Sequence, residues 1–122
     1  MCALAPIRLL IADDHPGFAS WLAQLLADEA SVQVVGIAHD GAQAVALAAA
    51  LEPDVVLLDV DMPRLDGFQA AERIRERSPA VGIVIVTGTE RWIDNARKVG
   101  GFVLKDDVGD KLVAAIHAEI AA

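Results

Sequence analysis

Three carboxylates, a hydroxyl and an amine each come directly after a short apolar run in this sequence. Asp13 and Asp14 follow LLIA, Asp59 follows VVLL, Thr87 follows IVIV and Lys105 follows FVL. Clustered carboxylates repel one another, and Mg²⁺ relieves that repulsion because it prefers oxygen ligands. A carboxylate can also attack a phosphoryl group, while an ammonium and a hydroxyl balance the charge on the phosphoryl oxygens. The residue types therefore indicate a metal-assisted aspartyl-phosphate site.

The elements that must position these residues alternate between strands and helices. Helices are expected after His15, after an N-cap at Asp110, and over residues 41–51, 67–77 and 92–99. The apolar runs predict strands over residues 7–12, 32–38, 55–58, 83–86 and 102–104. This (βα)₅ pattern predicts an α/β fold with a doubly wound parallel sheet in the order 2-1-3-4-5. Strands one, three, four and five then end at the same edge of the sheet, where ligands bind in such folds.

Each of the five residues also has an ordinary structural interpretation when it is considered alone. Asp13 and Asp14 can cap a helix, Asp59 and Thr87 can end strands, and Lys105 can lie on the surface. Their placement together at one edge of the predicted sheet favours the chemical interpretation, because fold and site then agree.

The first helix has a regular apolar pattern. Phe18, Trp21, Leu22, Leu25 and Leu26 fall at positions i, i+3, i+4, i+7 and i+8. Residues with this spacing lie on one side of a helix, so we expect all five side chains to face the core.

Composition narrows the class of protein. The 122 residues fit a single domain over residues 1–122, with a core of about 7–120. A net charge of -8 argues against binding to nucleic acid or to anionic membranes. No apolar stretch is long enough to span a membrane, and the opening residues MCALAPIRLL do not resemble a signal peptide. The lone cysteine, Cys2, has no partner for an internal disulfide, so we expect a cytoplasmic protein.

Four strings of residues resemble the response-regulator receiver domains of two-component signalling. These strings are LLIADDHPGF, PDVVLLDVDMPRLDGFQA, IVIVTG and GGFVLKDD, and the resemblance covers residues 7–120. The pattern is most similar to receivers fused to LuxR-type helix-turn-helix outputs. The resemblance implies a flavodoxin-like fold and a phosphorylation-dependent signalling role, with a histidine kinase as phosphoryl donor. It also implies a phospho-acceptor that catalyses only its own phosphorylation and dephosphorylation.

The resemblance also assigns roles around the acceptor. Asp59 would accept the phosphoryl group, and Asp13, Asp14 and Asp59 would hold Mg²⁺ (or Mn²⁺) together with the backbone carbonyl of Asp61.

Further roles concern the bound phosphoryl group and the response to it. Lys105 and Thr87 would contact phosphoryl oxygens, and Phe102 would be an aromatic switch that becomes buried as Thr87 moves. Asp61 and Thr89 would flank the mouth of the pocket and tune the lifetime of the phosphoryl group.

Three features depart from the family pattern. The interval from Thr87 to Lys105 is short, which predicts a shortened helix-four region. Phe102 lacks the hydroxyl of the commoner tyrosine, and Arg64 stands where glycine is usual.

The sequence also fits two other interpretations. The string Asp59-Val60-Asp61 also resembles the DxD motif of haloacid-dehalogenase-type phosphatases, although that motif belongs on a first strand. A receiver that works without phosphate, purely as a binding platform, is a third interpretation. The output would be a downstream protein or a C-terminal domain missing from this sequence, and a homodimer is possible.

The histidines carry no predicted function. His15, His39 and His117 fall on three different elements, and no two of them have the spacing of metal ligands on one helix.

Overall fold

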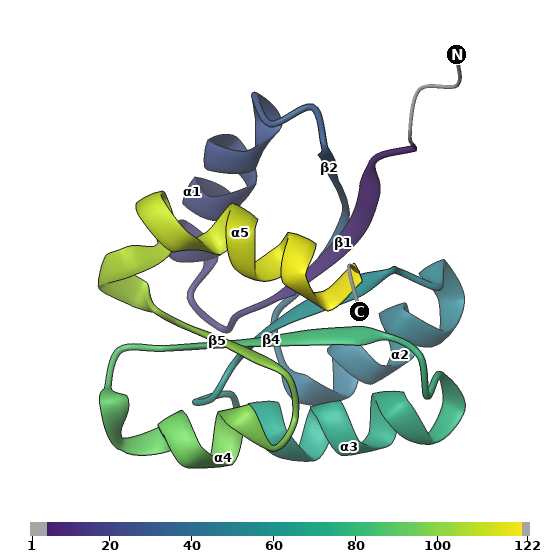
Figure 1. Ribbon diagram of the computed structural model, residues 1–122. Helices are drawn as coiled ribbons and strands as arrows, with labels where there is room; N and C mark the ends of the chain where they lie inside the picture. The colour runs from purple at the N-terminus through teal and green to yellow at the C-terminus, as the bar shows by residue number, and fades with distance from the viewer. Residues whose placement is uncertain (1–4, 121–122) are drawn as a thin grey trace.

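The computed structural model describes residues 5–120, so Cys2 lies outside the described residues. Five parallel strands form one sheet in the order β2-β1-β3-β4-β5 (Figure 1). The strands are β1 (Ile7–Ala12), β2 (Val32–Ala38), β3 (Val55–Asp59), β4 (Gly82–Thr87) and β5 (Gly101–Leu104). The main helices are α1 (Pro16–Ala27), α2 (Gly41–Leu51), α3 (Gly67–Arg77), α4 (Ile93–Arg97) and α5 (Val108–Ile120). The predicted fold class and strand order are confirmed.

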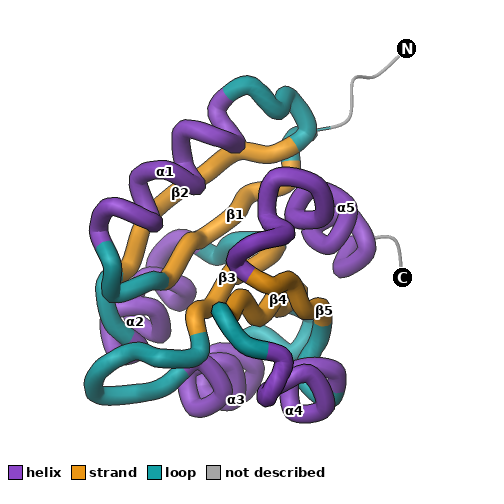
Figure 2. The backbone as a smooth tube through the Cα atoms, turned by 90° about the vertical axis from the view of Figure 1, so that its left-hand side faces the viewer, coloured by secondary structure: helices purple, strands orange, loops and turns teal. Residues whose placement is uncertain are grey.

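Helices cover both faces of the sheet. Helices α1 and α5 lie on one face, and α2, α3 and α4 lie on the other, as Figure 2 shows. Every residue of β3 is buried, because β3 lies in the middle of the sheet between these two layers. No helix within residues 5–120 has the length and apolar character needed to cross a membrane.

Local signals in the sequence explain where the helices begin. Pro16 occupies the first turn of α1, where its missing N–H costs nothing. Asp40 caps α2 by accepting a hydrogen bond from the backbone N–H of Gln43 at 2.7 Å. Asp66 and Gln69 form a reciprocal capping box at the start of α3.

The buried side of α1 differs from the prediction. Ala19, Leu22 and Leu26 face the core, whereas Trp21 and Leu25 are 47% and 39% exposed. The prediction of a buried Trp21 and Leu25 is therefore wrong. The buried stripe instead runs through positions 19, 22 and 26, at i, i+3 and i+7 of the helix, and this places Trp21 and Leu25 beside it.

The segments around β5 also differ from the prediction. The expected helix over residues 92–99 is split into a 3₁₀ turn, η1 (Glu90–Trp92), and the five-residue α4. A second 3₁₀ turn, η2 (Lys105–Asp107), runs into α5, so α5 begins before Asp110. Asp110 lies in the first turn of α5, where a carboxylate is favourable beside the positive end of the helix, and it is not the N-cap.

Candidate functional site

The end of β1 presents two acids to one edge of the sheet. The backbone N–H of Asp13 donates to the carbonyl of Ala38 at 3.0 Å, which continues the pairing with β2. Asp13 is buried, with 2% of its surface exposed, while the Asp14 side chain is partly open to solvent. The Asp13 carboxylate accepts a hydrogen bond from the backbone N–H of His15 at 2.8 Å and so fixes the turn into α1.

The end of β3 places Asp59 beside these acids. Asp59 is 3% exposed and pairs in register with Val86 of β4. Helix α3 begins close to the backbone of Asp59. The approach is so close that a Cβ on residue 67 would overlap the carbonyl oxygen of Asp59, and only glycine fits there. The glycine of the Asp-Gly pair therefore sets how closely α3 approaches the site.

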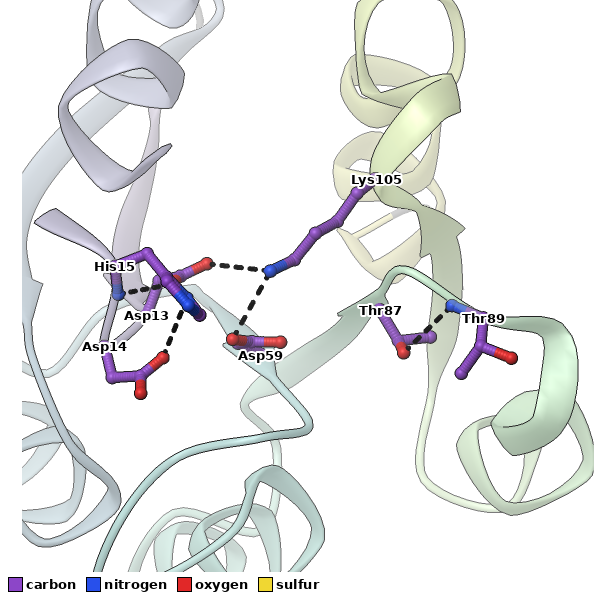
Figure 3. A network of polar contacts seen from close by, with 7 residues as sticks. All are labelled: Asp13, Asp14, His15, Asp59, Thr87, Thr89 and Lys105. Carbon is purple, nitrogen blue, oxygen red and sulfur yellow. Dashed lines mark hydrogen bonds and ion pairs between the residues drawn. The ribbon is translucent and has the colours of Figure 1, made fainter. Parts of the chain in front are cut away.

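Lys105 reaches across the site from the residue after β5 (Figure 3). Its Nζ lies 3.5 Å from Asp59 Oδ2 and 3.8 Å from Asp13 Oδ2. The same ammonium lies 4.8 Å from the centre of the Phe18 ring on α1, a cation–π distance. Lys105 therefore joins the ends of β1 and β3 electrostatically.

The buried Asp59 carboxylate lies in surroundings that disfavour its negative charge. Burial, and next the negative charge of Asp13, raises the pKa of Asp59 to about 6, although Lys105 acts in the opposite direction. Asp59 Oδ2 is buried without a hydrogen-bond partner. Asp14 Oδ1 is likewise buried without a hydrogen bond, although the His15 ring lies 2.9 Å away. Two buried carboxylate oxygens without hydrogen bonds, in one cluster of acids, favour binding of a cation.

The donor set fits a divalent metal ion. One ligand atom each from Asp13, Asp14, His15 and Asp59 lies within 4.8 Å of the other three. Three carboxylates suit Mg²⁺, which takes oxygen ligands and retains several waters. His15 was given no role by the sequence reasoning. His15 contacts the acids because of the conformation of the turn between β1 and α1. Residue spacings typical of helices do not predict a contact of this kind.

The remaining predicted residues lie around this cluster and do not all join it. Thr87 is buried at the end of β4, and its hydroxyl accepts from the backbone N–H of Thr89 at 3.3 Å. In Figure 3 Asp59 lies between Thr87 on one side and Asp13 and Asp14 on the other. The Thr89 side chain is the N-cap of η1. Phe102 is partly buried against the core beneath α3 and α4, and the Asp61 side chain is exposed.

Known proteins are similar to this chain in sequence and in fold. The family model for the response regulator receiver domain matches residues 9–117. The nitrate/nitrite response regulator protein NarL of Escherichia coli K12 is 36% identical over 120 residues, which are 95% of this chain and 56% of that protein. The chain thus spans little more than half the length of this relative.

Solved structures agree with the family match. The signal receiver domain of NarL from Mycobacterium tuberculosis is 32% identical, with a TM-score of 0.82, and the match covers 93% of this chain and 98% of that one. A LuxR-family two-component response regulator from an Aurantimonas species is 30% identical, with a TM-score of 0.88, and the match covers 95% of this chain and 86% of that one. The fold and the acidic strand ends define a two-component signalling module. The chain belongs to the response regulator receiver domain family.

Proposed function

We propose that this chain is a phosphorylation-dependent switch that takes a phosphoryl group from a histidine kinase onto Asp59. The observation that carries the proposal is the buried Asp59 carboxylate, whose Oδ2 has no hydrogen bond and lies 3.5 Å from Lys105 Nζ. In the transfer, an Asp59 oxygen forms a bond to phosphorus while the bond from phosphorus to the kinase imidazole nitrogen breaks. The leaving imidazole keeps the electron pair of that bond, and the product is an aspartyl phosphate.

The metal would be Mg²⁺ (or Mn²⁺), held by Asp13, Asp14 and Asp59 with the backbone carbonyl of Asp61. When bound, it offsets the negative charge of the carboxylates and of the phosphoryl oxygens. Asp13 and Asp14 are positioned for this role because both follow the last residue of β1, beside Asp59.

Lys105 would pair with a phosphoryl oxygen, because its ammonium already lies over Asp59. Thr87 would exchange its hydrogen bond with the Thr89 amide for one to the phosphoryl group. That movement would draw the loop after β4 inward and let Phe102, now partly buried, pack more deeply. Asp61 and Thr89 would adjust how long the phosphoryl group survives.

The acidic surface favours a protein partner over nucleic acid, since the chain carries a net charge of -8. The output would be a separate downstream protein, a further domain of a longer chain, or a second copy of this one. The competing phosphatase interpretation places its DxD motif on a first strand, whereas Asp59 ends β3.

The test is intact-mass spectrometry after incubation with Mg²⁺ and acetyl phosphate. We expect the wild type to gain one phosphoryl group, and we expect no gain in Asp59→Asn or without a divalent ion. A folded wild-type protein that gains nothing would overturn the proposal in favour of a phosphate-independent platform. Sustained release of phosphate from a phosphomonoester would overturn it in favour of a phosphatase.

Lys105→Ala separates metal binding from switching. We expect this variant to bind Mg²⁺, because Lys105 is not a ligand, yet to show no change at Phe102 on phosphorylation. The measurement is the ¹H–¹³C NMR signal of the Phe102 ring in the variant and in the wild type. A normal change in the variant would contradict the role assigned to Lys105.

A further inference from the structure

His15 lies among the acids of the site although its neighbours in sequence suggest only a helix start. Its Nδ1 is 2.9 Å from Asp14 Oδ1 and 3.2 Å from Asp13 Oδ1. The residue is the N-cap of α1, but its side chain makes no capping hydrogen bond. The imidazole is therefore directed at the carboxylates and not at the helix that it begins (Figure 3).

The backbone holds the imidazole in this place. Asp13 Oδ1 accepts a 2.8 Å hydrogen bond from the N–H of His15 itself, which ties both ends of the turn together. The side chain is exposed on its outer side, so solvent ions reach it freely. His15 Nδ1 is thus a nitrogen donor at the rim of an oxygen-rich site.

A second observation, the buried Asp59 carboxylate, supports ion binding at this site. Asp59 is 3% exposed, and its Oδ2 is buried without a hydrogen-bond partner. One donor atom from each of His15, Asp13, Asp14 and Asp59 lies within 4.8 Å of the others, which is compatible with ligation of a single cation.

We propose that His15 is a fourth side-chain ligand, beside Asp13, Asp14 and Asp59, and that it strengthens binding of imidazole-preferring ions of the Zn²⁺ and Co²⁺ class at this site relative to Mg²⁺. Mg²⁺ prefers oxygen and gains little from an imidazole. Zn²⁺ and Co²⁺ accept imidazole nitrogen readily, and a mixed set of carboxylates and one histidine suits them. The two classes of ion would compete, because both use the carboxylates of Asp14 and Asp59. This inference rests on the metal site of the proposed function.

The test compares ions in His15→Gln by isothermal titration calorimetry on the full chain. We expect Zn²⁺ and Co²⁺ affinity to fall by on the order of tenfold or more, as loss of a direct ligand should exceed the effect of losing an outer-shell partner. Mg²⁺ affinity should change by less than about twofold, because its ligands are oxygens. The matched control is His117→Gln, since His117 is an exposed imidazole that contacts Ser31 outside the site.

The visible absorption spectrum of bound Co²⁺ gives an independent readout. We expect the d–d bands to shift in His15→Gln and to stay unchanged in His117→Gln. Equal losses for Mg²⁺ and Zn²⁺, or a Co²⁺ spectrum that does not respond to His15→Gln, would overturn the role of His15. In those cases Mg²⁺ binding and phosphorylation of Asp59 would still support the proposed function. A wild type that binds none of these ions would overturn both.

Discussion

Replacing Asp59 with asparagine should stabilise the metal-free protein at neutral pH. The carboxylate is 3% exposed, and burial together with the charge of Asp13 raises the pKa of Asp59 to about 6. In the unfolded chain an aspartate titrates near pH 3.9, so between these values the folded state holds a proton that the unfolded state has lost. Stability therefore falls as pH rises from about 4 to about 6. Above about pH 6 the ionised Asp59 lowers the free energy of unfolding by the full amount, about 3 kcal/mol.

The asparagine side chain would carry no charge and would remove this cost. We expect the gain from Asp59→Asn to approach 3 kcal/mol at pH 7.5, or roughly 10 °C in melting temperature for a domain of this size, and to fall to about 0.5 kcal/mol near pH 4. The opposing attraction of Lys105 is already included in the raised pKa. Mg²⁺ should reduce the difference in stability between Asp59→Asn and the wild type, because the ion binds the wild-type carboxylates and stabilises the folded wild-type protein.

The assay is urea denaturation followed by circular dichroism, in EDTA, at several values between pH 4 and pH 8. The matched control is Asp61→Asn, which removes the same charge from an exposed side chain two residues away. We expect little change in that variant. A less stable Asp59→Asn protein, or a gain of equal size at pH 4 and pH 7.5, would refute the electrostatic account of the site.

Three further substitutions test other parts of the structure. Arg64 has a left-handed backbone with φ of 73°, so Arg64→Gly should gain about 1 kcal/mol in urea denaturation, whereas Arg64→Ala should not. Phe18→Leu removes the ring beneath the Lys105 ammonium, so labelling by acetyl phosphate should slow several-fold at unchanged Mg²⁺ affinity. Glu119→Ala removes the acceptor of the Ile83 N–H, at 3.1 Å, and should cost about 1–2 kcal/mol, while Glu119→Gln should cost less.

The strands and the core of the site could be predicted because their signals are local. Each apolar run is a strand, and the polar residue after it lies at the carboxyl edge of the sheet once the strands are parallel. The convergence of Asp13, Asp59 and Lys105 follows from that order alone. Long-range packing decides which side of a helix is buried, and so the pattern in α1 misplaced Trp21 and Leu25.

Two parts of the site lay beyond sequence reasoning. His15 contacts the acids through a turn in which its own backbone N–H donates to Asp13. A contact made in a turn does not follow the regular residue spacing from which helices and strands are predicted. Thr87 lies at the expected strand end, yet its hydroxyl is engaged by the Thr89 amide. The end of a strand determines where a residue such as Thr87 lies in the fold. The conformation of the following loop determines which groups its side chain contacts.

The short interval between β4 and β5 leaves the site intact because strand pairing fixes its last residue. Thr87 pairs with Leu104, so Lys105 must follow at the same edge whatever the length of the segment between the strands. The helix in that segment, α4, has five residues. The chain turns back beside β4 at Gly100, where a Cβ would overlap the carbonyl oxygen of Ile83.

Arg75 of α3 holds the segment that follows α4. Its guanidinium donates to the carbonyl of Val99, just after α4, and to the carbonyl of Val81, just before β4, the latter at 3.3 Å. One side chain thereby ties the segment after α4 to the start of β4, at the end of the sheet opposite the acids. The position of α4 and the geometry of the acidic site thus depend on different contacts, and a change in one need not alter the other.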